Sequence, residues 1–179
     1  MLDYALDVGF AHIFASSPDG PVVVHAPIAR VGSSVRFHVA RSNRATPHLN
    51  DASILASIAG PHGYVTPNWY ENPKDQVPTW NYVAVEIDGV ARPTDETGLR
   101  ELLDALANTH EPRPNQWILA KTDPVKVDAM LRAIVGFEIE ITAVRGTAKL
   151  HQHKSEADRE GVRAGLRALG NGSLAEAMP

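Results

Sequence analysis

The order of the secondary-structure patterns along the chain is the feature that most limits its fold. Up to about residue 94 the sequence consists of short alternating or β-branched segments separated by turn signals such as "PDG" and "RVGSS". The six segments that we expect to be strands are residues 9–17, 21–29, 35–40, 52–60, 62–66 and 82–94. A parallel α/β sheet would place a helix between successive strands, so this order favours antiparallel pairing.

The period changes after residue 94. Residues 95–111 and 123–134 carry apolar side chains at helical spacing, residues 136–146 alternate again, and residues 155–169 predict a closing helix. Asp123 and Ser155 stand where helix caps are expected, and the tail from residue 173 is predicted to fray. The sequence therefore predicts an α+β fold, an antiparallel sheet or barrel with peripheral helices, as a single domain over residues 1–179.

Composition excludes several classes of site. A net charge of -4 provides no general attraction to nucleic acid or acidic membranes, and a chain without cysteine has no disulfide, thiolate metal site or cysteine nucleophile. The N-terminus resembles no signal peptide, and no apolar run reaches the roughly 18 residues of a membrane helix. We expect a soluble, cytoplasmic protein without a membrane partner.

Common catalytic and nucleotide motifs are absent from the sequence, including the dinucleotide loop, the phosphate loop and the nucleophile elbow. His151 and His153 in "HQH" place two imidazoles on one side of an expected strand, where they either contact a ligand or face solvent; we predict no metal site there. Arg159, Arg163 and Arg167 form a stripe interleaved with acids, which is typical of a solvated helix face.

A different pattern points to a flat phosphorylated ligand. His25 and Pro27 share one strand, and His38, Arg41 and Asn43 end the next, where an arginine beside short polar side chains suits a phosphate. The segment 60–82 adds five large aromatic side chains, Tyr64, Trp69, Tyr70, Trp80 and Tyr82. Their rings can wall an apolar pocket and the neighbouring amides can bond a polar ring edge, a combination that FMN would satisfy.

Several blocks resemble the PaiB-like family, described as FMN-binding negative transcriptional regulators. They are "GPHGYVTPNWY", "VPTWNYVAVEIDG", "LRAIVGFEIEI" and "KLHQHKSEADREGV", together with the early "H-x-P" and "H-x-A-R-x-N" patterns. Their order and spacing agree from about residue 10 to about residue 170. The resemblance implies an FMN-binding split barrel, a Greek-key antiparallel barrel, that pairs as a homodimer with FMN at the interface.

Matching positions imply the flavin site. The candidate residues are His25, Pro27, His38, Arg41, Asn43, Thr66, Thr79, Trp80, Asn81 and Gln152. Arg41 is the candidate phosphate ligand, assisted by Asn43 and Thr79, while Trp80, Asn81 and Tyr82 are expected near the isoalloxazine ring or the interface.

The chain departs from the family at two places. The usual N-terminal segment and helix are not matched, which implies a missing or remodelled helix. "LHQHK" stands where the family has "L-S-Q-N-R": His151, His153 and Lys154 replace Ser, Asn and Arg, and of the four polar positions only Gln152 is retained. Three functions follow as alternatives: an FMN-binding regulator that represses genes, an FMN-dependent oxidoreductase or flavin reductase, and, more weakly, a haem-binding split barrel. DNA contact has no support from charge or motif.

Overall fold

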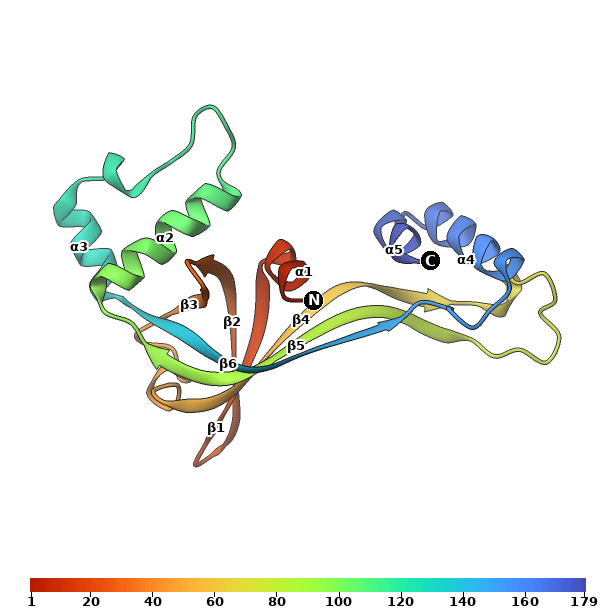
Figure 1. The fold of residues 1–179 in the computed structure, drawn as a ribbon, viewed down its shortest axis with the longest axis horizontal. Helices are drawn as coiled ribbons and strands as arrows, with labels where there is room; N and C mark the ends of the chain where they lie inside the picture. Colours follow the sequence, from red (N-terminus) through yellow and green to blue (C-terminus); the bar gives the residue numbers. More distant parts are fainter. The chain divides into compact units, whose positions relative to one another are not determined.

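The computed structural model describes residues 1–179 and consists of a six-stranded antiparallel barrel with helices around it (Figure 1). The strands are β1 (Phe10–Ser17), β2 (Gly20–Val31), β3 (Ser34–Ala40), β4 (Ala52–Val65), β5 (Thr79–Pro93) and β6 (Ile134–Lys149). The helices are α1 (Leu2–Val8), α2 (Glu96–His110), α3 (Pro124–Arg132), α4 (Glu156–Ala168) and α5 (Gly172–Ala177), with short 3-10 turns η1 (Thr46–His48), η2 (Pro67–Trp69) and η3 (Leu119–Lys121).

The strand order around the barrel is β1-β2-β3-β6-β5-β4, and β1 closes the ring by pairing with β4. The antiparallel registers place His12 opposite His25 and His38 opposite Gly136. This topology confirms the predicted α+β split barrel with peripheral helices, in which β6 joins the sheet from far along the chain.

The helix starts follow the predicted capping chemistry. Asp123 Oδ1 accepts hydrogen bonds from the amides of Val125 and Lys126, and Ser155 Oγ accepts one from the amide of Asp158. Pro124 occupies the first helical position, where its missing N–H leaves no bond unmade.

Three local predictions are wrong. The segments 52–60 and 62–66 form one continuous strand, β4, so five strands rather than six precede α2. The tail forms α5 instead of fraying, because Leu174, Ala175 and Met178 are buried. His151 and His153 do not lie on a strand, since β6 ends at Lys149. Of the two alternatives for the N-terminus, a missing or a remodelled helix, the structure has a short helix, α1.

The chain divides into two compact units, Met1–Ile58 with Glu86–Arg145 and Ala59–Val85 with Gly146–Pro179. The first, here called the barrel unit, includes a core between β2, α2 and α3 that contains Ala29, Leu102 and Leu131. The second, here called the C-terminal unit, has its own core, built around Val65, Tyr70, Val162, Leu166 and Leu174. None of the helices combines the length and apolarity required for a membrane span.

Candidate functional site

The predicted site residues fall into two sets, one in each unit. The barrel unit holds His25, Pro27, His38, Arg41 and Asn43, and the C-terminal unit holds Thr66, Thr79, Trp80, Asn81 and Gln152.

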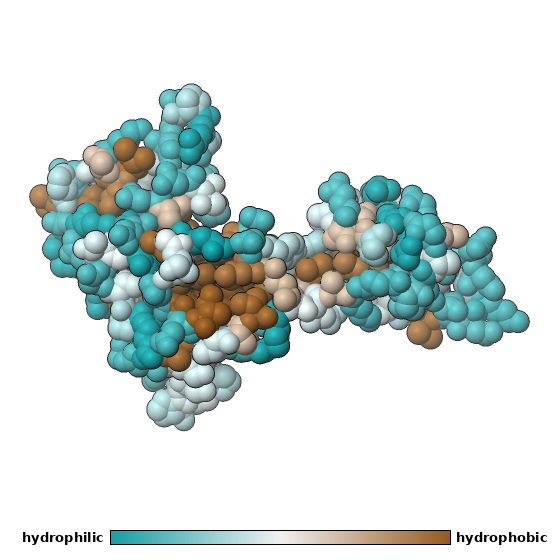
Figure 2. All heavy atoms as spheres, viewed as in Figure 1, coloured by the Kyte–Doolittle hydropathy of each residue, from teal (hydrophilic) through white to brown (hydrophobic).

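The outer side of β1 and β2 presents aromatic and imidazole rings without an aspartate, glutamate, lysine or arginine among them. His12 and His25 lie opposite each other with ring centroids 4.8 Å apart, and Phe10 is opposite Pro27. Phe10 and Phe14 are 47% and 40% exposed. We call Phe10, His12, Phe14, His25 and Pro27 the barrel face. Hydrophobic residues gather over β1 and β2 in Figure 2. Flat rings on an uncharged strand surface suit stacking and apolar contact with a planar ligand.

His38 is half-buried on β3, and its Nδ1 atom is buried without a hydrogen-bond partner. Burial lowers the pKa of His38, because an imidazolium would lose its hydration. On β6, Gly136 lies opposite His38 and accepts a 2.9 Å bond from the amide of Thr94, whose hydroxyl oxygen is also buried without a partner. One unbonded polar atom therefore belongs to the residue opposite Gly136 on β3, and another to the residue whose amide bonds to Gly136, whereas buried polar groups normally have partners.

The absence of a side chain at Gly136 leaves space for the Thr94 hydroxyl and the Leu99 side chain. A Cβ atom at this position would lie 2.5 Å from Thr94 Oγ1 and 3.1 Å from Leu99 Cδ1. The two unpartnered atoms are of the kind that a cofactor with polar ring edges or an ordered water can satisfy, so the residues of this region fit a flavin.

Arg41 and Asn43 are engaged with the backbone. The Arg41 guanidinium donates to the carbonyls of Arg132 at 2.9 Å and Ile134 at 3.1 Å, and Asn43 Oδ1 accepts from the amide of Ala45 at 2.9 Å. Arg41 also borders a pocket of about 190 Å³ that includes Asp95. An arginine has five N–H donors, so Arg41 retains donors for a phosphate while its other bonds fix its orientation.

The C-terminal unit engages most of its predicted residues internally. Thr66 Oγ1 accepts from the amide of Asn68, and Gln152 bonds to the amide of Leu150 and the carbonyl of Ala148. Trp80 is exposed, stacks on His62 with centroids 5.9 Å apart, and donates from Nε1 to His62 Nδ1.

Asn81 takes part in a buried chain of hydrogen bonds with two residues that the flavin-site prediction left out. His151 Nδ1 lies 2.6 Å from Asn81 Oδ1, and Tyr70 Oη lies 2.7 Å from His151 Nε2. Because the Asn81 oxygen can only accept, His151 carries its proton on Nδ1, and the Tyr70 hydroxyl donates to Nε2. We call these three residues the Tyr70–His151–Asn81 network.

The environment of the network keeps His151 neutral. Burial lowers the pKa of His151 most, the positive charges of His153, Lys154 and Lys149 lower it further, and Asp158 raises it. Burial, followed by the charge of Asp158, raises the pKa of Tyr70. His151 adopts a left-handed backbone conformation with φ of 62°, which turns the chain just after β6 and directs its ring inward.

Beside this network is a pocket of about 200 Å³. It is lined by Tyr70, Gln76, Val77, Thr79, Asn81, Lys149, His151, His153 and Lys154. Lys149 Nζ donates to Thr79 Oγ1 at 2.7 Å, and Lys154 Nζ donates to Gln76 Oε1 at 2.7 Å and lies 4.7 Å from the Tyr70 ring centroid. The pocket therefore combines two ammonium groups with neutral hydrogen-bonding groups.

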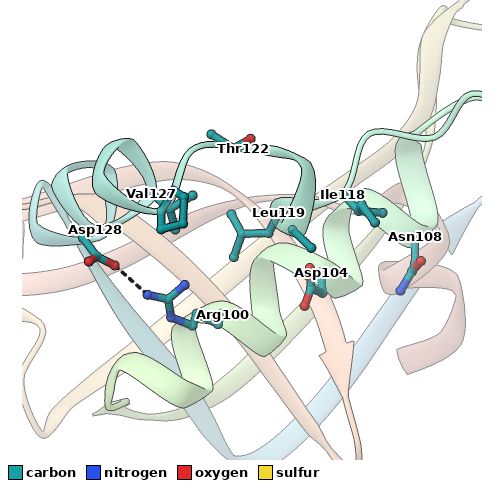
Figure 3. A pocket seen from close by; sticks show the side chains of 10 residues that line it. Arg100, Asp104, Asn108, Ile118, Leu119, Thr122, Val127 and Asp128 are labelled. Atoms are coloured by element: carbon teal, nitrogen blue, oxygen red, sulfur yellow. Dashed lines mark hydrogen bonds and ion pairs between the residues drawn. The ribbon is translucent and has the colours of Figure 1, made fainter.

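The largest pocket, about 540 Å³, lies between α2, α3 and the segment that joins them (Figure 3). Its single arginine, Arg100, is paired with Asp128 at 2.9 Å and with Glu96 at 2.7 Å, and Asp104 adds another acid. None of the predicted site residues lines it. With its cation already neutralised, this pocket is poorly suited to a phosphorylated cofactor.

The six-stranded barrel with peripheral helices defines a fold class, the split barrel. Two solved structures share the fold. The "FAD and Heme binding protein" of Mycobacterium smegmatis matches with a TM-score of 0.62 and 19% identity, over 92% of this chain and 76% of that one. The haem storage protein HutZ of Vibrio cholerae matches with a TM-score of 0.52 and 9% identity, over 83% and 91%.

The sequence identifies the family within this class. A family model described as "Putative FMN-binding domain" matches residues 1–143. The "Protease synthase and sporulation protein PAI 2" of Bacillus subtilis (strain 168) is 34% identical over 164 residues, covering 87% of this chain and 77% of that protein. An uncharacterised Aspergillus fumigatus protein is 30% identical over 180 residues, covering 89% of this chain and 66% of that one. The chain belongs to the PaiB-like family of FMN-binding proteins and is a flavoprotein with FMN as its cofactor.

The predicted flavin-site residues did not include His12 or the two pocket lysines, and the sequence offered Tyr70 only as a pocket wall and His151 only as a possible ligand contact. His12 alternates with Phe10 and Phe14 on β1, so the period of the strand could have placed it on the barrel face. Tyr70 and His151 are 81 residues apart in the sequence, and no local pattern joins them.

Proposed function

We propose that this FMN protein is a homodimeric oxidoreductase, in which two copies meet at the barrel face and hold the cofactor there with His25, Pro27 and His38. The observation that carries the proposal is the uncharged ring surface on β1 and β2, together with the unpartnered Nδ1 atom of His38. FMN, when bound, supplies hydride and electron transfer. We further propose that the protein works in the cytoplasm.

The side chains of this region would bind and orient rather than react. Exposed Phe10 and Phe14 are large apolar groups that a second subunit could cover, since contiguous exposed apolar surface marks interaction sites. His38, with its lowered pKa, would be a neutral hydrogen-bond partner for a ring edge. At the end of the same strand, Arg41 offers its remaining donors to the phosphate, with Asn43 close by.

The dimer can be tested by sedimentation. Phe14→Lys should convert the protein to a monomer and release FMN, because a charge would be buried at the interface. Tyr64→Lys is the matched control, since Tyr64 is an aromatic residue of the C-terminal unit that is 52% exposed. A wild-type protein that sediments as a monomer at micromolar concentration would refute the interface.

The redox function can be tested by absorption. The purified protein should show a flavin spectrum rather than a haem one, and anaerobic addition of reduced nicotinamide should bleach the band near 450 nm (roughly, the usual flavin maximum). A flavin band that persists under excess reductant argues against the oxidoreductase, and a Soret band would favour the haem alternative.

Gene repression is the second candidate, and its support is the 34% identity to the sporulation protein of B. subtilis. The arginine stripe of α4, the clearest candidate for DNA contact, is paired with acids: Arg159 with Glu156, Arg163 with Glu156 and Glu160. Paired arginines contribute little attraction to phosphates. Electrophoretic shift with promoter fragments at physiological salt should therefore show no retarded band, and a salt-sensitive shift would favour repression.

A further inference from the structure

The two lysines of the pocket beside the network differ from most cations of this protein. Every ion pair in the structure uses an arginine, for example Arg36 with Glu138 or Arg145 with Asp88. Lys149 and Lys154 instead bond to neutral oxygens, the Thr79 hydroxyl and the Gln76 amide. These bonds hold the two ammonium groups in place without neutralising their charge.

The walls of the pocket supply hydrogen bonds but no opposing charge. None of the nine lining residues is an aspartate or a glutamate. The acid with a resolved influence here, Asp158, is outside the lining, and its Oδ1 accepts from the amide of Glu71 at 3.0 Å. Each ammonium has three N–H donors and spends one on its neutral partner, so both retain donors for a ligand.

The size of the pocket limits what can enter. About 200 Å³ is below the roughly 300–1,000 Å³ of sites that enclose a drug-sized molecule. It can hold a phosphate or carboxylate group but not a whole flavin. The back wall is rigid, because the Tyr70–His151–Asn81 network is buried and His151 bonds through both ring nitrogens.

We propose that Lys149 and Lys154 form a binding site for a small oxyanion, a phosphate or carboxylate group, against the Tyr70–His151–Asn81 network. Two ammonium groups bonded to neutral partners beside a pocket without a carboxylate favour an anion by charge, and charge-assisted hydrogen bonds add to the selection. The site lies wholly within the C-terminal unit, so it does not depend on the proposed flavin site on the barrel face.

The test is a calorimetric titration of inorganic phosphate into flavin-free protein, with chloride adjusted to hold the ionic strength constant. The wild type should bind one phosphate with saturation. Lys149→Met and Lys154→Met should each weaken phosphate by about tenfold, the expected loss of one charge-assisted bond. Lys154→Arg should restore most of the binding. Lys126→Met is the matched control, since Lys126 is on α3 and lines none of the pockets described above. All variants should unfold at the same urea concentration as the wild type.

Repeating the titration on FMN-loaded protein distinguishes two sources of the same group. Undiminished binding identifies a free anion, whereas competition identifies the phosphate of FMN itself; both results confirm an oxyanion site. No saturable binding to the wild type, or equal binding by the lysine variants and the wild type, overturns the proposal. Loss of FMN from a Phe14→Lys variant that still binds phosphate would leave this site intact.

Discussion

The barrel unit and the C-terminal unit differ in how they satisfy a buried imidazole. In the barrel unit, His38 Nδ1 is buried without a hydrogen-bond partner, as is Thr94 Oγ1; in the C-terminal unit one atom, Arg159 Nε, shares that state. In the C-terminal unit, His151 uses both ring nitrogens within 2.7 Å of protein atoms. A buried polar atom without a hydrogen bond destabilises the folded state, and a ligand that bonds to it removes that destabilisation. A buried polar group with all its hydrogen bonds made is held rigidly. The difference therefore separates an imidazole that can still bond to a ligand, His38, from one whose two nitrogens are already bonded, His151.

The largest effect is expected from a substitution that disrupts the packing of the C-terminal unit. A Cβ atom at Gly161 would collide with the carbonyl oxygen of Trp69, so α4 can only approach η2 closely with glycine there. Gly161→Ala should reduce the free energy of unfolding by about 3 kcal/mol, measured by urea denaturation. Gly172→Ala, where a Cβ meets nothing within 4 Å, is the control and should unfold as the wild type does. Equal stability of the two variants would contradict the close approach.

The next prediction concerns the barrel unit. If Arg41 binds the FMN phosphate, Arg41→Ala should weaken FMN by about 1.5–3 kcal/mol, measured by quenching of flavin fluorescence. Arg44→Ala changes a nearby exposed arginine on the same loop and should retain FMN. Affinity that is the same in both variants would place the phosphate elsewhere, for example beside Lys149.

A smaller effect should follow from the removal of one hydrogen bond of the Tyr70–His151–Asn81 network. Tyr70→Phe removes the hydroxyl that donates to His151 Nε2 and leaves that nitrogen buried without a partner. The free energy of unfolding should fall by about 1–2 kcal/mol. Tyr64→Phe removes a hydroxyl from an exposed ring and should cost nothing measurable. If Tyr70→Phe is neutral, the network is not the rigid wall that the anion site requires.

The smallest expected effect is a dependence of stability on pH. The pKa values of His38 and His151 are both lowered, chiefly by burial, so the folded state holds both neutral while the unfolded chain protonates them below about pH 6.5. The two neutral imidazoles therefore contribute their whole stabilisation above pH 6.5 (roughly, the unfolded pKa). This stabilisation is lost as the pH falls from there through the lower pKa values of the folded state. Urea midpoints measured from pH 7.5 to 5 should decline, and His38→Gln and His151→Gln should each flatten the decline. An unchanged slope in both variants would show that neither imidazole is held neutral.

Local patterns predicted the elements well and the network poorly. The alternation of β3 and the caps Asp123 and Ser155 depend on neighbours a few residues away, which a sequence displays directly. The tail was predicted to fray because nothing in "SLAEAMP" shows that Leu174 and Met178 enter a core that combines α4 with the distant residues Val65 and Tyr70. Nonlocal contacts of this kind decide burial, and no period reveals them.

The need for nonlocal contacts also explains why the sequence predicted the barrel residues but not the Tyr70–His151–Asn81 network. His25, Pro27 and His38 could be placed on the barrel from strand periodicity and family resemblance, whereas Tyr70 and His151 meet only in the folded chain. The departure of "LHQHK" from the family pattern raised a question about flavin contact at His151. The structure places that imidazole instead between Tyr70 and Asn81.

The left-handed backbone of His151 has a consequence for how this sequence can change over evolutionary time. Glycine or asparagine would relieve a conformation that costs most other residues about 1 kcal/mol, but glycine would leave Tyr70 and Asn81 without a shared partner. At position 151 the backbone conformation therefore favours glycine or asparagine, whereas the hydrogen bonds to Tyr70 and Asn81 favour histidine. Substitutions at 151 should become fixed together with changes at 70 and 81, so among descendants of this chain the three positions should vary as one.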